Sequence, residues 1–187
     1  MKTTTALITS LLIIFSSAIS SAAEMPVVRM KTTAGEFLIQ LDDERAPISV
    51  ANFLKYVEDG FYEGTLFHRI ENGFIIQGGG YDAEYQPRET RPSIPNESGN
   101  GLSNLSMTIA MARTNDPHTA DSQFYINLAD NSSLDPKPTR WGYAVFGSVI
   151  EGEEVVNDIG YRATSPQPGL PKTPAVPIII ESVMIVE

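Results

Sequence analysis

Residues 67–80 read FHRIENGFIIQGGG, with apolar segments on both sides of Glu71-Asn72-Gly73. An Asn-Gly pair between such segments is a strong signal for a β-hairpin turn. The sequence therefore predicts antiparallel strands over Leu66–Ile70 and Phe74–Gln77. Three glycines, Gly78–Gly80, follow the second strand. They could suggest a phosphate-binding loop, but no Lys-Ser/Thr follows to open a helix, so we expect a tight bend there.

Strand patterns dominate the rest of the chain, and only two segments have the pattern of a helix. Pro47 opens the first helix, which carries apolar residues at helical spacing and ends at Gly60. The second helix is a short one over Glu153–Ile159. Further strands are expected at Val27–Thr33, Glu36–Leu41, Met107–Ala112, Gln123–Leu128, Tyr143–Val149 and Ile178–Val186. Many short strands with two helices favour a β-barrel or sandwich over alternating βαβ units.

The first residues have the pattern of a secretory signal peptide. A basic tip at Lys2 precedes the apolar stretch Ala6–Phe15, and small residues follow up to Ala23. The apolar part is too short to span a membrane, which takes about 20 residues. We therefore expect a signal peptide over 1–23, cleavage between Ala23 and Glu24, and a domain over 24–187. This predicts a periplasmic protein with no membrane anchor after cleavage.

Composition excludes several kinds of chemistry. The 187 residues include no cysteine, so disulfides, thiolate metal sites and thiol nucleophiles are ruled out. Two histidines leave little material for a histidine-rich metal site, and we expect no bound metal. The net charge of −10 argues against nucleic-acid binding, which uses a basic face. Lys2 is the only charged residue in 1–23, so the mature chain would carry −11.

Five segments together resemble the cyclophilin family of peptidyl-prolyl isomerases, and most closely its exported bacterial branch. The first is the FHR-x(4)-F-x(2)-QGG pattern that begins at Phe67. The others, in order, are Met111–Thr114, Ser122–Asn127, Leu134-Asp135 and Tyr143–Gly147. The likeness runs from about Val27 to Val186.

The resemblance implies a mainly β fold: a closed eight-stranded antiparallel β-barrel capped by two α-helices. It also implies cis/trans rotation about X–Pro bonds without a cofactor. The partners would be proline-containing unfolded or partly folded polypeptides, and we expect the protein to be a monomer. The alternative is a peptide-binding chaperone with incidental isomerase activity. A serine hydrolase is a distant third, because no G-x-S-x-G motif occurs.

By the same resemblance, Arg69 is the catalytic residue. The groove that binds the substrate would be lined by Phe74, Ile75, Gln77, Ala112, Arg113, Gln123, Tyr125, Leu134 and Tyr143. His68 is expected to support the groove or Arg69, since bond rotation transfers no proton. The family often has tryptophan where this chain has Ser133, so weak cyclosporin binding is expected.

Strand periodicity agrees with only part of this groove. A period of two puts Gln123 and Tyr125 on one face. Phe74 and Gln77 are separated by an odd offset, so we expect a bulge or a strand-end twist near Gly78–Gly80 to bring them together.

Overall fold

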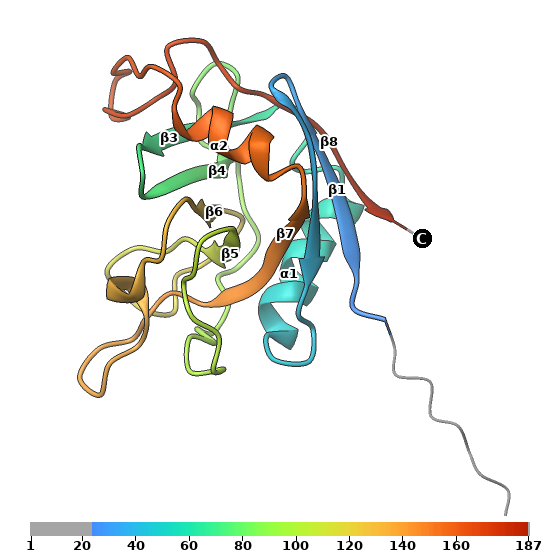
Figure 1. Ribbon diagram of the computed structural model, residues 1–187, viewed down its shortest axis with the longest axis vertical. Coiled ribbons are helices and arrows are strands. Elements are labelled where there is room, and N and C mark those ends of the chain that lie inside the picture. Colours follow the sequence, from blue (N-terminus) through green and yellow to red (C-terminus); the bar gives the residue numbers. More distant parts are fainter. Residues whose placement is uncertain (1–23, 187) are drawn as a thin grey trace, which may run out of the picture.

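The computed structural model describes residues 24–186, and the predicted signal peptide lies outside them. Eight strands and two α-helices follow one another along the chain (Figure 1). The helices are α1 (Pro47–Glu58) and α2 (Glu153–Gly160), and a short 3₁₀ helix spans Ser132–Leu134. The strands are β1 (Val27–Thr32), β2 (Gly35–Leu41), β3 (Thr65–Glu71), β4 (Ile75–Asp82), β5 (Thr108–Met111), β6 (Phe124–Asn127), β7 (Val145–Glu151) and β8 (Ile180–Val186). The predicted mainly β architecture with two helices is confirmed.

All eight strands form one curled antiparallel sheet, in the order β3-β4-β6-β5-β7-β2-β1-β8. The prediction of a closed barrel is wrong. The two edge strands, β3 and β8, approach each other, but within residues 24–186 the pairing there is an isolated bridge between Leu66 and Ile179, the residue before β8, instead of a continuous ladder. Pro177 lies just before β8 and has no backbone N–H to extend the pairing.

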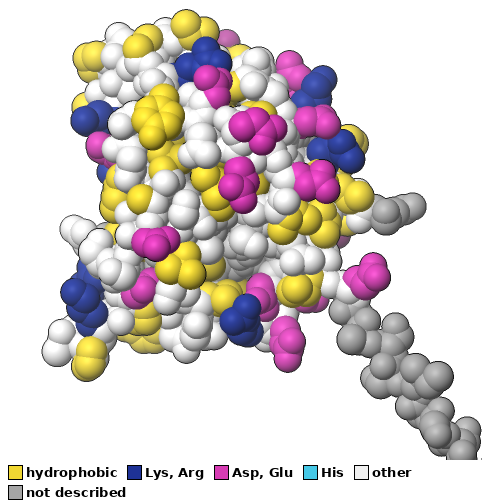
Figure 2. All heavy atoms as spheres, in the orientation of Figure 1, with side chains coloured by type: hydrophobic (Ala, Val, Ile, Leu, Met, Phe, Trp, Pro, Cys, Tyr) yellow, Lys and Arg dark blue, Asp and Glu magenta, His cyan; other side chains and the backbone are white. Residues whose placement is uncertain are grey.

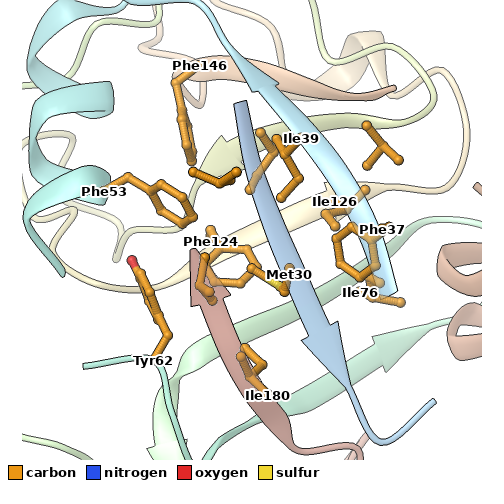
Figure 3. Close-up of a cluster of buried hydrophobic side chains, with 14 of the residues drawn as sticks. Met30, Phe37, Ile39, Phe53, Tyr62, Ile76, Phe124, Ile126, Phe146 and Ile180 are labelled. Atoms are coloured by element: carbon orange, nitrogen blue, oxygen red, sulfur yellow. The ribbon is translucent and has the colours of Figure 1, made fainter. Parts of the chain in front are cut away.

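The main core fills the concave side of the sheet. Phe53 of α1 packs against Tyr62, Phe124 and Phe146, with ring centroids 5.1, 5.7 and 5.3 Å away. These four rings point toward one another in Figure 3. From α2, Val156 contributes a fully buried side chain. The two helices thus cover apolar surface that the sheet alone would leave in water.

The bend predicted at Gly78–Gly80 is present as an irregularity between β3 and β4. Phe67 pairs with Gly78, but Thr65, two residues earlier, pairs with Asp82, so β4 has extra residues there. At Gly79, φ is +82° and a Cβ atom would lie 2.9 Å from the rings of Tyr62 and Phe124. Glycine is therefore required at this position by both the backbone and the packing.

A second, smaller apolar cluster lies on the other face of the sheet. Its buried members are Ile75, Ala110, Ala112, Tyr125 and Val145. Successive side chains of a strand point to opposite faces of the sheet. Ile76 and Ile126 belong to the main core, so their neighbours Ile75 and Tyr125 point to the other face. Within residues 24–186, no helix is both long and apolar enough to cross a membrane.

Candidate active site

A groove opens over the second cluster and brings nine predicted site residues together. They surround a pocket of ≈ 160 Å³ and are Arg69, Phe74, Ile75, Gln77, Ala112, Arg113, Tyr125, Leu134 and Tyr143. Arg69, Gln77 and Arg113 provide its charged and polar lining, and Phe74, Tyr125 and Leu134 provide apolar walls. Of the predicted set, only His68 and Gln123 do not line this pocket.

Strand register explains why the central residues meet. Arg69 of β3 pairs with Gln77 of β4, and Gln77 pairs in turn with Tyr125 of β6. Paired residues on neighbouring strands project to the same face, so these three side chains form one row. Phe74 joins them from the turn before β4, outside the strand alternation. The bulge that we expected near Gly78–Gly80 is present between β3 and β4. However, Phe74 reaches the same face as Gln77 because it lies in the turn before β4.

Hydrogen bonds link the polar side chains of this row. The guanidinium of Arg69 donates to Gln77 Oε1 at 3.1 Å, and Gln77 Nε2 donates to Gln123 Oε1 at 2.9 Å. Arg69 also contacts the carboxylate of Glu71 at 3.4 Å. The same carboxylate lies 3.5 Å from the ammonium group of Lys172. Arg69 is held from two sides, and its side chain is still 40 % exposed.

Gln123 lines an adjoining pocket of ≈ 190 Å³, where Thr114, Thr119 and Asp121 form the far side. Gln77, Ala112 and Arg113 line both pockets, so the two form a continuous groove. Gly80 makes room for Gln123, because a Cβ atom at Gly80 would lie 2.5 Å from Gln123 Cγ.

His68 lies behind the groove. Its side chain is buried, its ring centroid is 4.6 Å from that of Tyr81, and its Nδ1 atom has no hydrogen-bond partner in the described part of the chain. Burial lowers the pKa of His68 to about 4, and the nearby charge of Arg69 acts in the same direction. The imidazole is therefore neutral at pH 7 and packs as a structural group.

Arg113 lines both pockets of the groove. Its guanidinium lies over the Tyr143 ring at 4.3 Å and donates to the carbonyl oxygens of Trp141 and Gly142. Neither the N–H nor the C=O of Arg113 has a backbone partner in the described part of the chain. This edge can therefore accept an added extended peptide.

Sequence reasoning missed the support beneath Tyr125. The Tyr125 hydroxyl donates to Asn104 Oδ1 at 2.6 Å, and the Asn104 backbone N–H and side-chain amide both donate to Asp135. Asn131 binds the carbonyl of Phe74 from the other side. Burial raises the pKa of Tyr125 well above its usual value, so the hydroxyl keeps its proton. The only sequence signal was the presence of several asparagines in polar loops.

The chemistry available in the groove is binding and hydrogen bonding. In residues 24–186, no group of three or more His, Asp or Glu side chains is arranged to hold a metal ion. The groove combines an apolar pocket, a fixed guanidinium and amide groups that can both donate and accept. Such a site can hold an apolar ring and stabilise a developing lone pair beside it.

Comparison with known proteins gives a consistent result. The model of the family described as cyclophilin type peptidyl-prolyl cis-trans isomerase/CLD matches residues 27–185. The chain is 47% identical over 164 residues to peptidyl-prolyl cis-trans isomerase cyp18 of Streptomyces antibioticus, covering 86% of this chain and 99% of the relative. It is 44% identical over 173 residues to peptidyl-prolyl cis-trans isomerase A of Dickeya dadantii, covering 92% and 90%.

A solved structure is also similar. It is the crystal structure of a cyclophilin type peptidyl-prolyl cis-trans isomerase from Cryptosporidium parvum, in the presence of the dipeptide Ala-Pro. The TM-score is 0.72 with 26% sequence identity, and the match covers 86% of this chain and 99% of the other.

Proposed function

This chain belongs to the cyclophilin-type peptidyl-prolyl cis-trans isomerase family and acts on proline-containing polypeptides, and we propose that catalysis takes place in the groove beside Arg69. The observation that carries the proposal is the shared pocket of Arg69 and the apolar side chains of Phe74, Tyr125 and Leu134. The related Cryptosporidium structure was determined in the presence of Ala-Pro, a dipeptide that contains proline.

The catalytic role of Arg69 follows from the chemistry of the peptide bond. Rotation costs about 18–20 kcal/mol because the nitrogen lone pair is delocalised into the carbonyl. At the twisted transition state the prolyl nitrogen regains its lone pair and becomes a hydrogen-bond acceptor. A donor aimed at that nitrogen binds the transition state more strongly than the planar ground state. Arg69 suits this role because its guanidinium cannot lose its proton at physiological pH.

The other groove residues position the substrate. The proline ring would contact Phe74, Ile75, Tyr125 and Leu134, while Gln77 and Gln123 would bind substrate backbone groups. The peptide would run along the unpaired backbone of Arg113. Gln77 has a second task, since its Oε1 accepts a hydrogen bond from Arg69 and limits the directions in which the guanidinium can point.

The test is a proline-limited refolding assay with residues 24–187. Arg69→Ala should abolish most of the acceleration, whereas Arg162→Ala, a change at an exposed site just after α2, should leave it intact. Undiminished acceleration by Arg69→Ala would contradict the catalytic assignment. Equal rescue of refolding yield by Arg69→Ala would favour the chaperone alternative.

The cellular setting is part of the same proposal. Residues 1–23 act as a cleaved signal peptide, the mature domain starts at Glu24, and the monomeric enzyme assists the folding of exported proteins in the periplasm. The support is the sequence pattern, together with a first strand that begins at Val27, three residues beyond the predicted cut. The mass of the exported protein tests the cut, and its elution on size exclusion tests the monomer.

A further inference from the structure

The cations of this acidic protein are distributed unevenly. Of the 13 Lys and Arg residues, Lys2 lies outside the described part of the chain, and eight others form ion pairs with carboxylates. The remaining four, which have no carboxylate within 4.0 Å among residues 24–186, are Arg88, Arg113, Lys137 and Arg140. Three of these four lie at one end of the groove.

Backbone contacts join these three cations to the groove wall. Arg113 lines the groove and donates to the carbonyl oxygen of Trp141 at 3.0 Å. Arg140 donates to the carbonyl oxygens of Ser133 and Asp135, the residues on either side of Leu134. Lys137 and Arg140 close a turn with reciprocal backbone hydrogen bonds of 2.8 and 3.0 Å. The turn that carries Lys137 and Arg140 is thus fixed to the wall that Leu134 contributes.

A pocket of ≈ 460 Å³ lies on this turn, lined by Ser98, Gly99 and the loop Pro136–Trp141. Neither this pocket nor the one in front of Arg69 has an Asp or Glu among its lining residues. Asp135, the adjacent carboxylate in the sequence, is turned toward Asn104. A carboxylate, Asp121, does line the adjoining pocket, to which Arg113 also contributes.

The cationic lining of these two pockets contrasts with the acidic character of the whole molecule. Carboxylate side chains are spread over the face drawn in Figure 2, and the whole chain has a net charge of −10. Cations without ion-pair partners attract anionic segments, and an exposed aromatic ring adds contact area beside them. Trp141, which is 48% exposed, provides such a ring.

We propose that Lys137, Arg140 and Trp141, together with the neighbouring Arg113, form a docking surface for an acidic segment of the client polypeptide. The segment flanks the proline bound in the groove, so the inference rests on the proposed function. It defines a substrate class: X–Pro sites with Asp or Glu within a few residues on one side. The acidic body repels such clients in general, and this end of the groove attracts them.

The test compares three proline peptides of equal length at low ionic strength. One has glutamates before the X–Pro bond, one has them after it, and one has glutamines at both places. The wild-type mature chain should isomerise at least one acidic peptide with kcat/KM roughly two- to fivefold higher than the glutamine peptide, mainly through KM. Added salt should reduce the difference.

Lys137→Glu should remove or reverse the preference and leave kcat/KM for the glutamine peptide unchanged. Arg162→Glu, which changes the net charge equally at a distant exposed site, should keep the preference. Arg69→Ala should instead lower kcat/KM for all three peptides, so failure of the proposed catalytic role is a separate result. The docking proposal is overturned if neither acidic peptide is preferred by the wild-type chain, or if Lys137→Glu leaves a preference intact.

Discussion

Neighbouring residues restrict the side chain of Arg69. Gln77 and Glu71 contact its guanidinium, and the register between β3, β4 and β6 sets the positions of Arg69 and Gln77. A long side chain loses much rotamer freedom when it is held in one place. Here the neighbouring contacts impose that loss in the free protein, as the catalytic role that we propose for Arg69 requires.

The burial of His68 makes the stability of the fold depend on pH. Its pKa of about 4 lies below the usual value of 6.5, because burial disfavours the charged imidazolium. Between pH 6.5 and 4 the unfolded chain takes up a proton at His68 that the folded chain does not. The free energy of unfolding therefore falls as the pH drops through this window, by roughly 3 kcal/mol at about 1.36 kcal/mol per pKa unit.

Denaturation by urea at pH 7 and pH 4 measures this effect. We expect His68→Gln to show a smaller loss of stability on acidification than the wild type, whatever its stability at pH 7. Parallel profiles for His68→Gln and the wild type would show that His68 titrates normally in the folded protein.

Gly80 packs closely against the side chain of Gln123. Gly80→Ala would place a Cβ atom 2.5 Å from Gln123 Cγ and displace the amide that binds Gln77. We expect a loss of about 1–3 kcal/mol in stability and a lower kcat/KM. In urea denaturation, the double variant Gly80→Ala/Gln123→Ala should be more stable than the sum of its single changes predicts. Strict additivity would mean that the clash is relieved elsewhere.

Among the elements of the fold, the long loop after β4 contacts both helix α1 and the groove. Glu97 from this loop accepts hydrogen bonds from the backbone N–H groups of Ile48 and Ser49 at 3.0 and 2.7 Å, at the start of α1. Ala46, the residue at the N-cap position, provides no side-chain cap. The loop therefore supplies the cap that the helix sequence lacks, and its Asn104 binds Tyr125 in the groove.

Removing this distant cap should destabilise α1. Glu97→Ala should reduce the free energy of unfolding by about 1–2 kcal/mol, because two N–H groups and the Ser49 hydroxyl lose their acceptor. Glu63→Ala is the control, since its exposed carboxylate accepts no hydrogen bond within residues 24–186. Thermal denaturation of both variants gives the comparison, and equal midpoints would contradict the capping role.

Elements with strong local patterns were predictable from the sequence. The helix from Pro47 and the hairpin at Asn72-Gly73 both occur in the structure, because the proline and apolar spacing of the helix and the Asn-Gly turn of the hairpin lie within the segments themselves. The contacts of Glu97 and Asn104 were not predictable, since they join positions far apart in the chain. Nine groove residues came from family resemblance, and the structure gathers them around one pocket.

At the scale of the whole molecule, the sheet is curled but open. Closure into a barrel would require pairing between β3 and β8, which lie more than 100 residues apart. The local sequence of either strand does not predict whether they pair, or in which register. The curled sheet still separates two faces: one holds the core, and the other carries the groove. Within residues 24–186, three of the four cations without a carboxylate partner lie in or beside this groove, which is where we propose that a polypeptide binds.

We propose that Arg69 stabilises the twisted transition state instead of binding the planar substrate. Exchange NMR on a proline peptide measures the rate of isomerisation on the enzyme and the dissociation constant in the same sample. For Arg69→Ala we predict a rate roughly 10- to 100-fold lower, as expected for loss of one charged hydrogen bond, with a dissociation constant changed by less than about threefold. An unchanged rate, or an effect confined to weaker peptide binding, would contradict this role of Arg69.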